Sequence, residues 1–211
     1  MAKITKIEIQ KRNKERVNIY IDDEYAFSTF IDIVYKEGLS KGQEVNKEKY
    51  DDIIKKENKQ KCKNTALRII ERAYKTEKEM RKRLSEKGYE EEEIEEAVNF
   101  LKEYKFIDDD SYVKLYIKEK IKAYGSQKIK YSLINKGISK EVIEEELNNI
   151  ESEEMKQTAL CLAEKKYKNL SKSENDKFKL YNKICRYLIS RGYEYDMVKS
   201  VTNKVLERDI W

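Results

Sequence analysis

Histidine is absent from this sequence of 211 residues, and so is proline. Without histidine there is no Ser-His-Asp or Cys-His mechanism, no histidine general base near neutral pH and no histidine-containing zinc site. Without proline the strongest helix breaker is missing. The sequence is 39% hydrophobic, which is enough for a folded core. These numbers predict a folded and mostly helical protein.

Cysteine and glycine are scarce as well. The three cysteines, Cys62, Cys161 and Cys185, have no CxxC spacing, which is typical of reduced thiols. The six glycines stand apart, so no Gly-rich phosphate-binding loop exists. No stretch approaches about 18 apolar residues and the start lacks an apolar signal core. We therefore expect a cytoplasmic protein that has no membrane partner and no cofactor.

Charged residues are abundant at 41%, but they nearly balance, with a net charge of +5. No basic tail appears, whereas a dedicated DNA-binding protein usually has a more one-sided excess. Asp108–Asp110 is the one acidic run that suggests a metal. It lacks the loop pattern of a calcium site, so we expect it to cap the following helix, and we predict no metal ligands.

The first 45 residues have the pattern of β-strands. Apolar residues alternate with polar ones around Ile7 and Ile9 and again from Val17 to Ile21, and a short run at 25–27 follows. Residues 29–37 are expected to form a short helix. Since a small meander is marginal alone, it must pack on helices. We assign 1–45 to an N-terminal β-rich extension and 46–63 to a connecting helix capped by Asn46.

The remaining residues repeat one pattern three times. In each copy an aliphatic residue is followed by Leu four residues later and by Gly eight residues later, ending at Gly88, Gly137 and Gly192. An apolar residue follows each glycine, as in a helix that ends at a left-handed glycine. We assign three-helix repeats to 64–107, 108–150 and 151–211. The predicted fold is mostly α, an elongated array of three tandem three-helix repeats preceded by a small β-meander plus helix.

Helix boundaries follow from the capping residues. The first helices of the repeats are expected at 66–74, 111–124 and 155–167, with a longer loop at 169–176 in the third repeat. Thr76 and Glu79 match a capping box, and Ser126 and Ser139 are the expected caps in the second repeat. The run 90–93 is placed at a helix N-terminus, where the helix dipole favours carboxylates.

Basic residues recur on the second helix of each repeat, and this recurrence indicates where a partner could bind. A positive stripe along that helix suits phosphates or an acidic protein groove, although solvated helix faces are the alternative for each residue. Tyrosines interleaved with lysines could stack on bases or anchor an interface, or simply pack. The candidate partner-binding residues are Arg81, Lys82, Arg83, Lys87, Lys128, Lys130, Lys136, Arg186, Arg191, Tyr124 and Tyr131.

The repeats resemble the RecX family of bacterial recombination regulators. The match is carried by Ala66–Arg72, by Glu79–Gly88, by the Phe-Ile-Asp-Asp junction at 106–109 with Tyr112, and by Gly125–Ile138 with its Lys-Gly turn. It is strongest over 64–150 and weaker over 151–208. The N-terminal strands resemble an extension found in some family members.

The resemblance implies a regulator that binds the RecA recombinase filament on DNA and inhibits its ATP hydrolysis and strand exchange. It implies no enzymatic activity of its own, and we expect a monomer. Two alternatives stay open. A direct binder of single- or double-stranded DNA would show salt-dependent affinity without RecA. A helical scaffold for another protein would bind neither.

Overall fold

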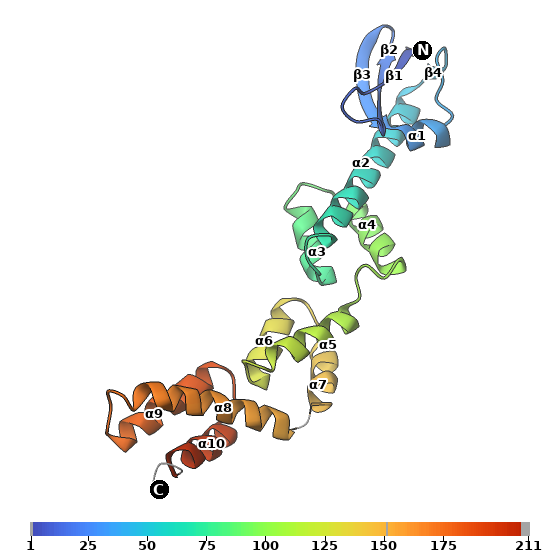
Figure 1. Cartoon of the computed structure of the whole chain (residues 1–211). Helices are drawn as coiled ribbons and strands as arrows, with labels where there is room; N and C mark the ends of the chain where they lie inside the picture. Colours follow the sequence, from blue (N-terminus) through green and yellow to red (C-terminus); the bar gives the residue numbers. More distant parts are fainter. Residues whose placement is uncertain (1, 151, 208–211) are drawn as a thin grey trace. The chain divides into compact units, whose positions relative to one another are not determined.

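A computed structural model describes residues 2–150 and 152–207 (Figure 1). The chain divides into two compact units. The first holds residues 1–73 and 80–106, and the second holds 74–79 and 107–211. The strands are β1 (Ala2–Ile9), β2 (Arg16–Ile21), β3 (Glu24–Phe30) and β4 (Glu44–Val45). The helices are α1 (Ile31–Lys36), α2 (Lys47–Ile70), α3 (Glu77–Ser85), α4 (Glu91–Glu103), α5 (Asp109–Lys120), α6 (Ser126–Asn135), α7 (Lys140–Asn148), α8 (Ser152–Leu170), α9 (Lys177–Ser190) and α10 (Tyr195–Glu207).

The N-terminal strands form one antiparallel sheet in the order β3-β2-β1-β4. Its alternating apolar residues face α1 and α2, so Ile4 and Ile19 pack with Ile33 and Ile53 in one core. The three predicted strands and the helix behind them are confirmed. Strand β4 was not predicted, because its two residues are too few to show alternation.

A buried carboxylate ties α2 to the sheet. The side chain of Glu57 is 1% exposed, and its Oε1 lies 2.6 Å from Nη1 of Arg16 on β2. The hydroxyl of Thr29 and the backbone N–H of Phe30 both donate to its other oxygen, at 2.8 and 2.9 Å. Burying a carboxylate is unfavourable unless it is paired and hydrogen-bonded, and Glu57 meets both conditions.

Three-helix repeats follow, and their glycine turns are alike. Gly88, Gly137 and Gly192 all have left-handed φ angles of 83°, 94° and 85°. In each turn the residue after the glycine donates its N–H to the carbonyl of the Leu five residues earlier. Because a side chain is strained in this conformation, glycine is required there. The predicted repeat pattern is therefore confirmed.

Several boundaries differ from the prediction. The expected connecting helix and the first helix of the first repeat are one continuous helix, α2, whose cap is Asn46 as predicted. In the third repeat α9 begins seven residues before Ile184, whereas α6 begins three residues before Ile129. Part of the added length therefore extends a helix by one turn rather than a loop.

The predicted caps are largely confirmed. Asp108 accepts from the N–H of Ser111, and Ser139 caps α7. The capping box of Thr76 and Glu79 is present, with both reciprocal distances 3.3 Å. The prediction that Ser126 caps α6 was wrong, because the N-cap of α6 is Gly125 and no side chain caps that helix.

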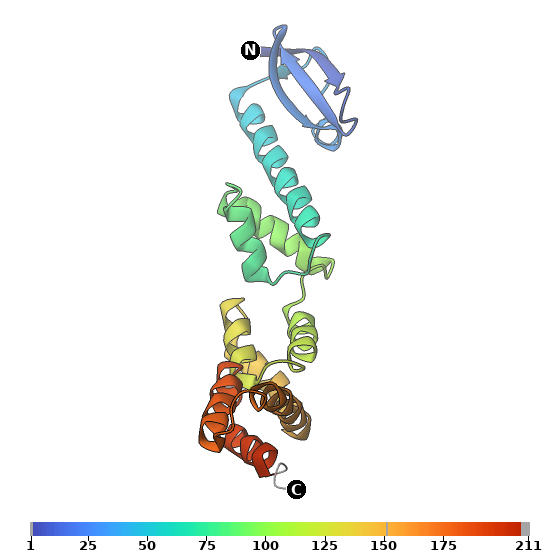
Figure 2. The ribbon, with the colours of Figure 1, turned by 60° about the vertical axis from the view of Figure 1, so that its left-hand side comes forward.

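The second unit contains two joints in which a glycine turn packs on the start of another helix. At the first, the backbone carbonyl of Lys136 accepts a 2.6 Å hydrogen bond from the hydroxyl of Thr76, the residue just before α3. At the second, Gly125 and Gln127 donate their N–H groups to the carbonyls of Arg191 and Gly192, at 2.9 and 3.1 Å. In Figure 2 the α9 ribbon lies next to that of α6. Each joint thus satisfies helix-end carbonyls that would otherwise need water.

Over residues 2–150 and 152–207, no helix is long and apolar enough to cross a membrane.

Candidate functional site

The candidate residues of the first repeat are mostly engaged in surface ion pairs. Arg81 reaches Glu91 and Glu95 on α4, with nitrogen–oxygen distances of 3.4 and 2.7 Å. Lys82 and Arg83 both lie near Glu86. Exposed pairs of this kind contribute little to stability, so these cations remain accessible to a partner.

Two candidate residues of the second repeat form ion pairs with acidic residues of other helices. Lys130 pairs with Glu144 on α7. Lys136 bonds to Glu79, with Nζ 2.6 Å from Oε1, and both side chains are about a quarter exposed. Partial burial is the largest influence on each pKa and acts against the charged form. The hydrogen bonds outweigh it, so the pKa of Glu79 is lowered and that of Lys136 is raised.

One position of the second helix is exposed in all three repeats. It is the second residue after the buried Met80, Ile129 or Ile184, and it is occupied by Lys82, Tyr131 and Arg186 respectively. All three were candidates from the sequence. Since an exposed tyrosine or cation at this position is not needed for the core, it is free to contact a partner.

Four tyrosines and five cations of the second unit form two groups of cation–π contacts that line a common cavity, together called the tyrosine–cation ladder. Lys136 follows α6, and its ammonium lies 5.4 and 5.8 Å from the ring centroids of Tyr112 and Tyr116 on α5. The Lys120 ammonium lies 5.6 Å from Tyr116. These distances are within the range of cation–π attraction.

The ladder continues across the second joint. The Lys128 ammonium is 4.7 Å from the Tyr124 ring centroid. The Arg191 guanidinium lies between Tyr124 and Tyr187, 5.6 and 4.6 Å from their centroids, and donates to the carbonyl of Ala123 at 2.8 Å. Lys166 on α8 is 5.3 Å from the Tyr187 ring and completes the ladder.

A small cavity of about 190 Å³ opens in the middle of the ladder. No acidic residue lines it, although the Lys120 ammonium is paired with the adjacent Glu119 at 2.7 Å. The cavity therefore presents ammonium groups beside aromatic faces, an arrangement that suits a phosphate, a base or an acidic side chain. Its lining residues are Tyr116, Lys120, Tyr124, Lys128, Ile129 and Ser132.

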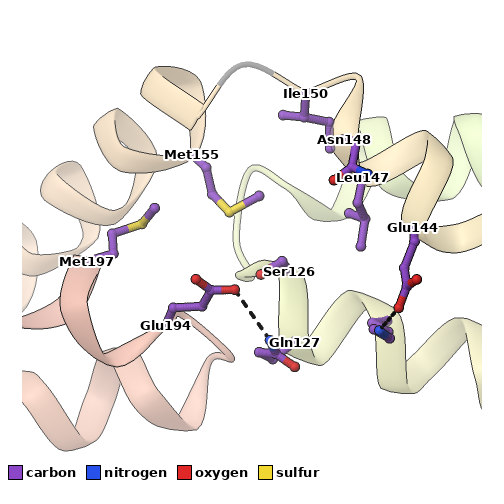
Figure 3. A pocket seen from close by; sticks show the side chains of 10 residues that line it. Ser126, Gln127, Glu144, Leu147, Asn148, Ile150, Met155, Glu194 and Met197 are labelled. Atoms are coloured by element: carbon purple, nitrogen blue, oxygen red, sulfur yellow. Dashed lines mark hydrogen bonds and ion pairs between the residues drawn. The ribbon is translucent and has the colours of Figure 1, made fainter.

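A larger cavity of about 410 Å³ lies between the second and third repeats (Figure 3). Leu147, Met155 and Met197 give it apolar walls. Gln127 donates to Glu194 at 3.4 Å on one side, and the Lys130–Glu144 pair lies on the other. The four side chains that face one another there, Gln127 with Glu194 and Lys130 with Glu144, are paired within the fold.

Only part of the ladder was predicted from the sequence. Tyr124, Lys128, Lys136 and Arg191 were candidates, whereas Tyr187 and Lys166 were missed. The spacing of Tyr112, Tyr116 and Lys120, four residues apart, is a signal that one face of α5 carries them. Tyr124 lies in the segment after this helix. The contribution from α8 and α9 has no such signal, since it arises from tertiary packing.

Comparison with known proteins covers nearly the whole chain. The model of the regulatory protein RecX N-terminal domain matches residues 2–46. Models of the first, second and third RecX three-helix domains match residues 62–101, 108–147 and 153–202.

Relatives that match over their whole length bear the same family name. "Regulatory protein RecX" of Clostridium beijerinckii is 51% identical over 210 residues, covering 100% of this chain and 99% of the relative. The protein of the same name from Clostridioides difficile is 37% identical, covering 99% and 98%. A crystal structure described as regulatory protein RecX superposes with a TM-score of 0.76 at 27% identity, covering 96% of this chain and 100% of that one. The chain therefore belongs to the RecX family of regulatory proteins.

Proposed function

We propose that this protein binds the RecA–DNA filament and inhibits its ATP hydrolysis and strand exchange. Membership of the RecX family carries the proposal, because relatives over the full length are named regulatory proteins. The family's association with RecA supplies the partner. The protein would act without a catalytic step of its own, since the ATPase belongs to the filament.

The tyrosine–cation ladder is the binding surface we assign to this function. It brings Lys120 and Lys128 to one cavity free of acidic lining residues. A RecA–DNA filament presents phosphates and protein carboxylates, and both attract such a surface. Occupying the filament in this way would hinder its growth and the conformational cycle that accompanies ATP hydrolysis.

Direct binding to DNA without RecA is the second candidate. Aromatic faces beside ammonium groups favour it, because bases stack on tyrosine while cations neutralise phosphates. This alternative requires that the isolated protein bind a single-stranded oligonucleotide, with an affinity that falls steeply as salt is raised.

Charge reversal at the cavity tests the proposal. Lys120→Glu with Lys128→Glu places two carboxylates among the tyrosines, and co-sedimentation with RecA filaments on single-stranded DNA measures binding. We expect affinity to fall at least about tenfold. The matched control is Lys199→Glu with Lys204→Glu, two exposed lysines of α10 outside the ladder. Equal binding by both double variants would remove the ladder from the interface.

A further inference from the structure

The glycine turn of the first repeat has the same internal structure as the two turns that form joints. Lys87, Gly88 and Tyr89 donate their N–H groups to Leu84, Ser85 and again Leu84. The corresponding residues around Gly137 and Gly192 make the same three hydrogen bonds. The φ angles of these glycines differ by little more than 10°. The three turns are thus copies of one docking element.

The surroundings of the three glycines differ sharply. A Cβ atom on Gly137 would lie 2.5 Å from Cβ of Lys78, and one on Gly192 would lie 2.4 Å from the backbone nitrogen of Lys128. A Cβ atom on Gly88 would meet nothing within 4 Å. Two turns are therefore covered by the start of another helix, and the third is open.

The polar groups of the open turn are also available. Among residues 2–150 and 152–207, no hydrogen bond reaches the carbonyl oxygens of Lys87 and Gly88, and Lys87 has no ion-pair partner. The equivalent cations have partners. Lys136 binds the carboxylate of Glu79 in the first turn of α3, and Arg191 binds the carbonyl of Ala123 just before α6. Helix-end carbonyls are complementary to a helix N-terminus with its N–H groups and positive dipole. The cation beside them requires an oxygen acceptor near that N-terminus, as Glu79 is for Lys136.

We propose that the Lys87–Gly88 turn is a docking site for the N-terminal turn of an α-helix in a partner protein. The two occupied joints define the chemistry of that turn. Its N-cap residue is Thr, Ser or Gly, as Thr76 and Gly125 are, and an oxygen acceptor within a turn of the cap receives Lys87, as Glu79 receives Lys136.

The second helices of another copy of this chain fit the open turn poorly. The starts of α3 and α6 are already covered by Lys136 and by Arg191 with Gly192. The remaining second helix, α9, begins one turn farther from its buried Ile184 than α6 does from Ile129, and Asp176 caps it. Its start therefore lacks the shape of the two helix starts that dock.

The partner is assigned to RecA, and this step rests on the proposed function. Gly88→Asn adds a side chain where the free protein has open space, and Asn tolerates the left-handed conformation. The matched control is Gly38→Asn, since Gly38 also has a positive φ and open space around it. Both variants should melt within a few degrees of each other. Co-sedimentation with RecA filaments should weaken at least about tenfold for Gly88→Asn alone.

Lys87→Glu provides an independent variant, with Lys105→Glu as its control in the exposed turn that closes α4. Binding by Gly88→Asn and Lys87→Glu equal to that of their controls would overturn the inference. So would a wild-type protein that self-associates and becomes monomeric with Gly88→Asn. A wild-type protein that fails to bind the filament would instead overturn the proposed function.

Discussion

Gly125 and Gly192 touch backbone to backbone, although 67 residues separate them in the sequence. A Cβ atom on Gly125 would lie 2.3 Å from the carbonyl oxygen of Gly192. The N–H of Gly125 donates to Arg191, next to Gly192, at 2.9 Å. The contact places Arg191 between the rings of Tyr124 and Tyr187. The joint between the repeats therefore also positions the middle of the ladder.

Gly125→Ala should destabilise the second unit by about 1–3 kcal/mol, because the added methyl group must push the joint apart. The φ of Gly125 is −81°, so alanine is not strained there and the clash is isolated. Calorimetry measures the loss, and hydrogen exchange should rise at the start of α6 and the end of α9. A loss below about 0.5 kcal/mol would show that the joint yields easily.

Tyr193→Phe should leave stability unchanged or raise it, whereas Tyr89→Phe should lower it by about 1 kcal/mol. The two tyrosines follow their glycines at equivalent positions. Tyr89 shares a 2.8 Å hydrogen bond with Thr65, but the hydroxyl of Tyr193 is buried without a partner in the described chain. That burial raises the pKa of Tyr193 to about 12. Chemical unfolding of both variants checks the difference, and a larger loss for Tyr193→Phe would contradict the assignment.

Glu57→Gln should destabilise the first unit by an amount approaching the roughly 3–5 kcal/mol of a broken buried ion pair, because Arg16 loses its counter-charge. The control is Glu48→Gln, an exposed glutamate of the same helix, which should change stability by less than about 0.5 kcal/mol. Thermal unfolding of the two variants gives the comparison. Equal melting temperatures would mean that the Glu57 network contributes no net stability.

Glu79→Gln should lower stability by about 1 kcal/mol at neutral pH, since it weakens a partly exposed pair with Lys136. The folded-state pKa of Glu79 is below its ordinary 4.5, so the contribution is present above pH 4.5 and is lost as pH falls through the lowered value. The pKa of Lys136 is above its ordinary 10.5, so its contribution is present below pH 10.5 and is lost above the raised value.

The difference between wild type and Glu79→Gln should therefore be constant across the neutral range and shrink in acid. Urea unfolding at a series of pH values measures it. A difference that persists unchanged at a pH well below the ordinary carboxyl range would assign the effect to packing rather than to charge.

Most of the fold could be predicted from local patterns in the sequence. Alternation at Val17 and Ile19 identified β2, and the spacing from Ile184 to Gly192 identified the repeat. Caps at Asn46 and Asp108 were readable because capping depends on neighbours along the chain.

Features that depend on residues far apart in the chain could not be predicted from the sequence. Nothing local marks Glu57 as buried, or places Tyr187 against Arg191. Ser126 was chosen as a cap because serine favours that position, but the close approach of Gly192 requires a glycine before α6. The basic residues were predicted as one group of candidates. Only tertiary contacts distinguish Lys136, which binds Glu79 in a joint, from Lys87, which has no ion-pair partner in the described part of the chain.

The rate of single-strand-dependent ATP hydrolysis by the cognate RecA, with and without this protein, tests the central claim most directly. Titration of the wild-type chain onto preformed filaments should lower the rate in a saturable manner, and the Lys120→Glu, Lys128→Glu variant should require at least about ten times more protein for the same effect. A rate that is unchanged at saturating wild-type protein would contradict the account.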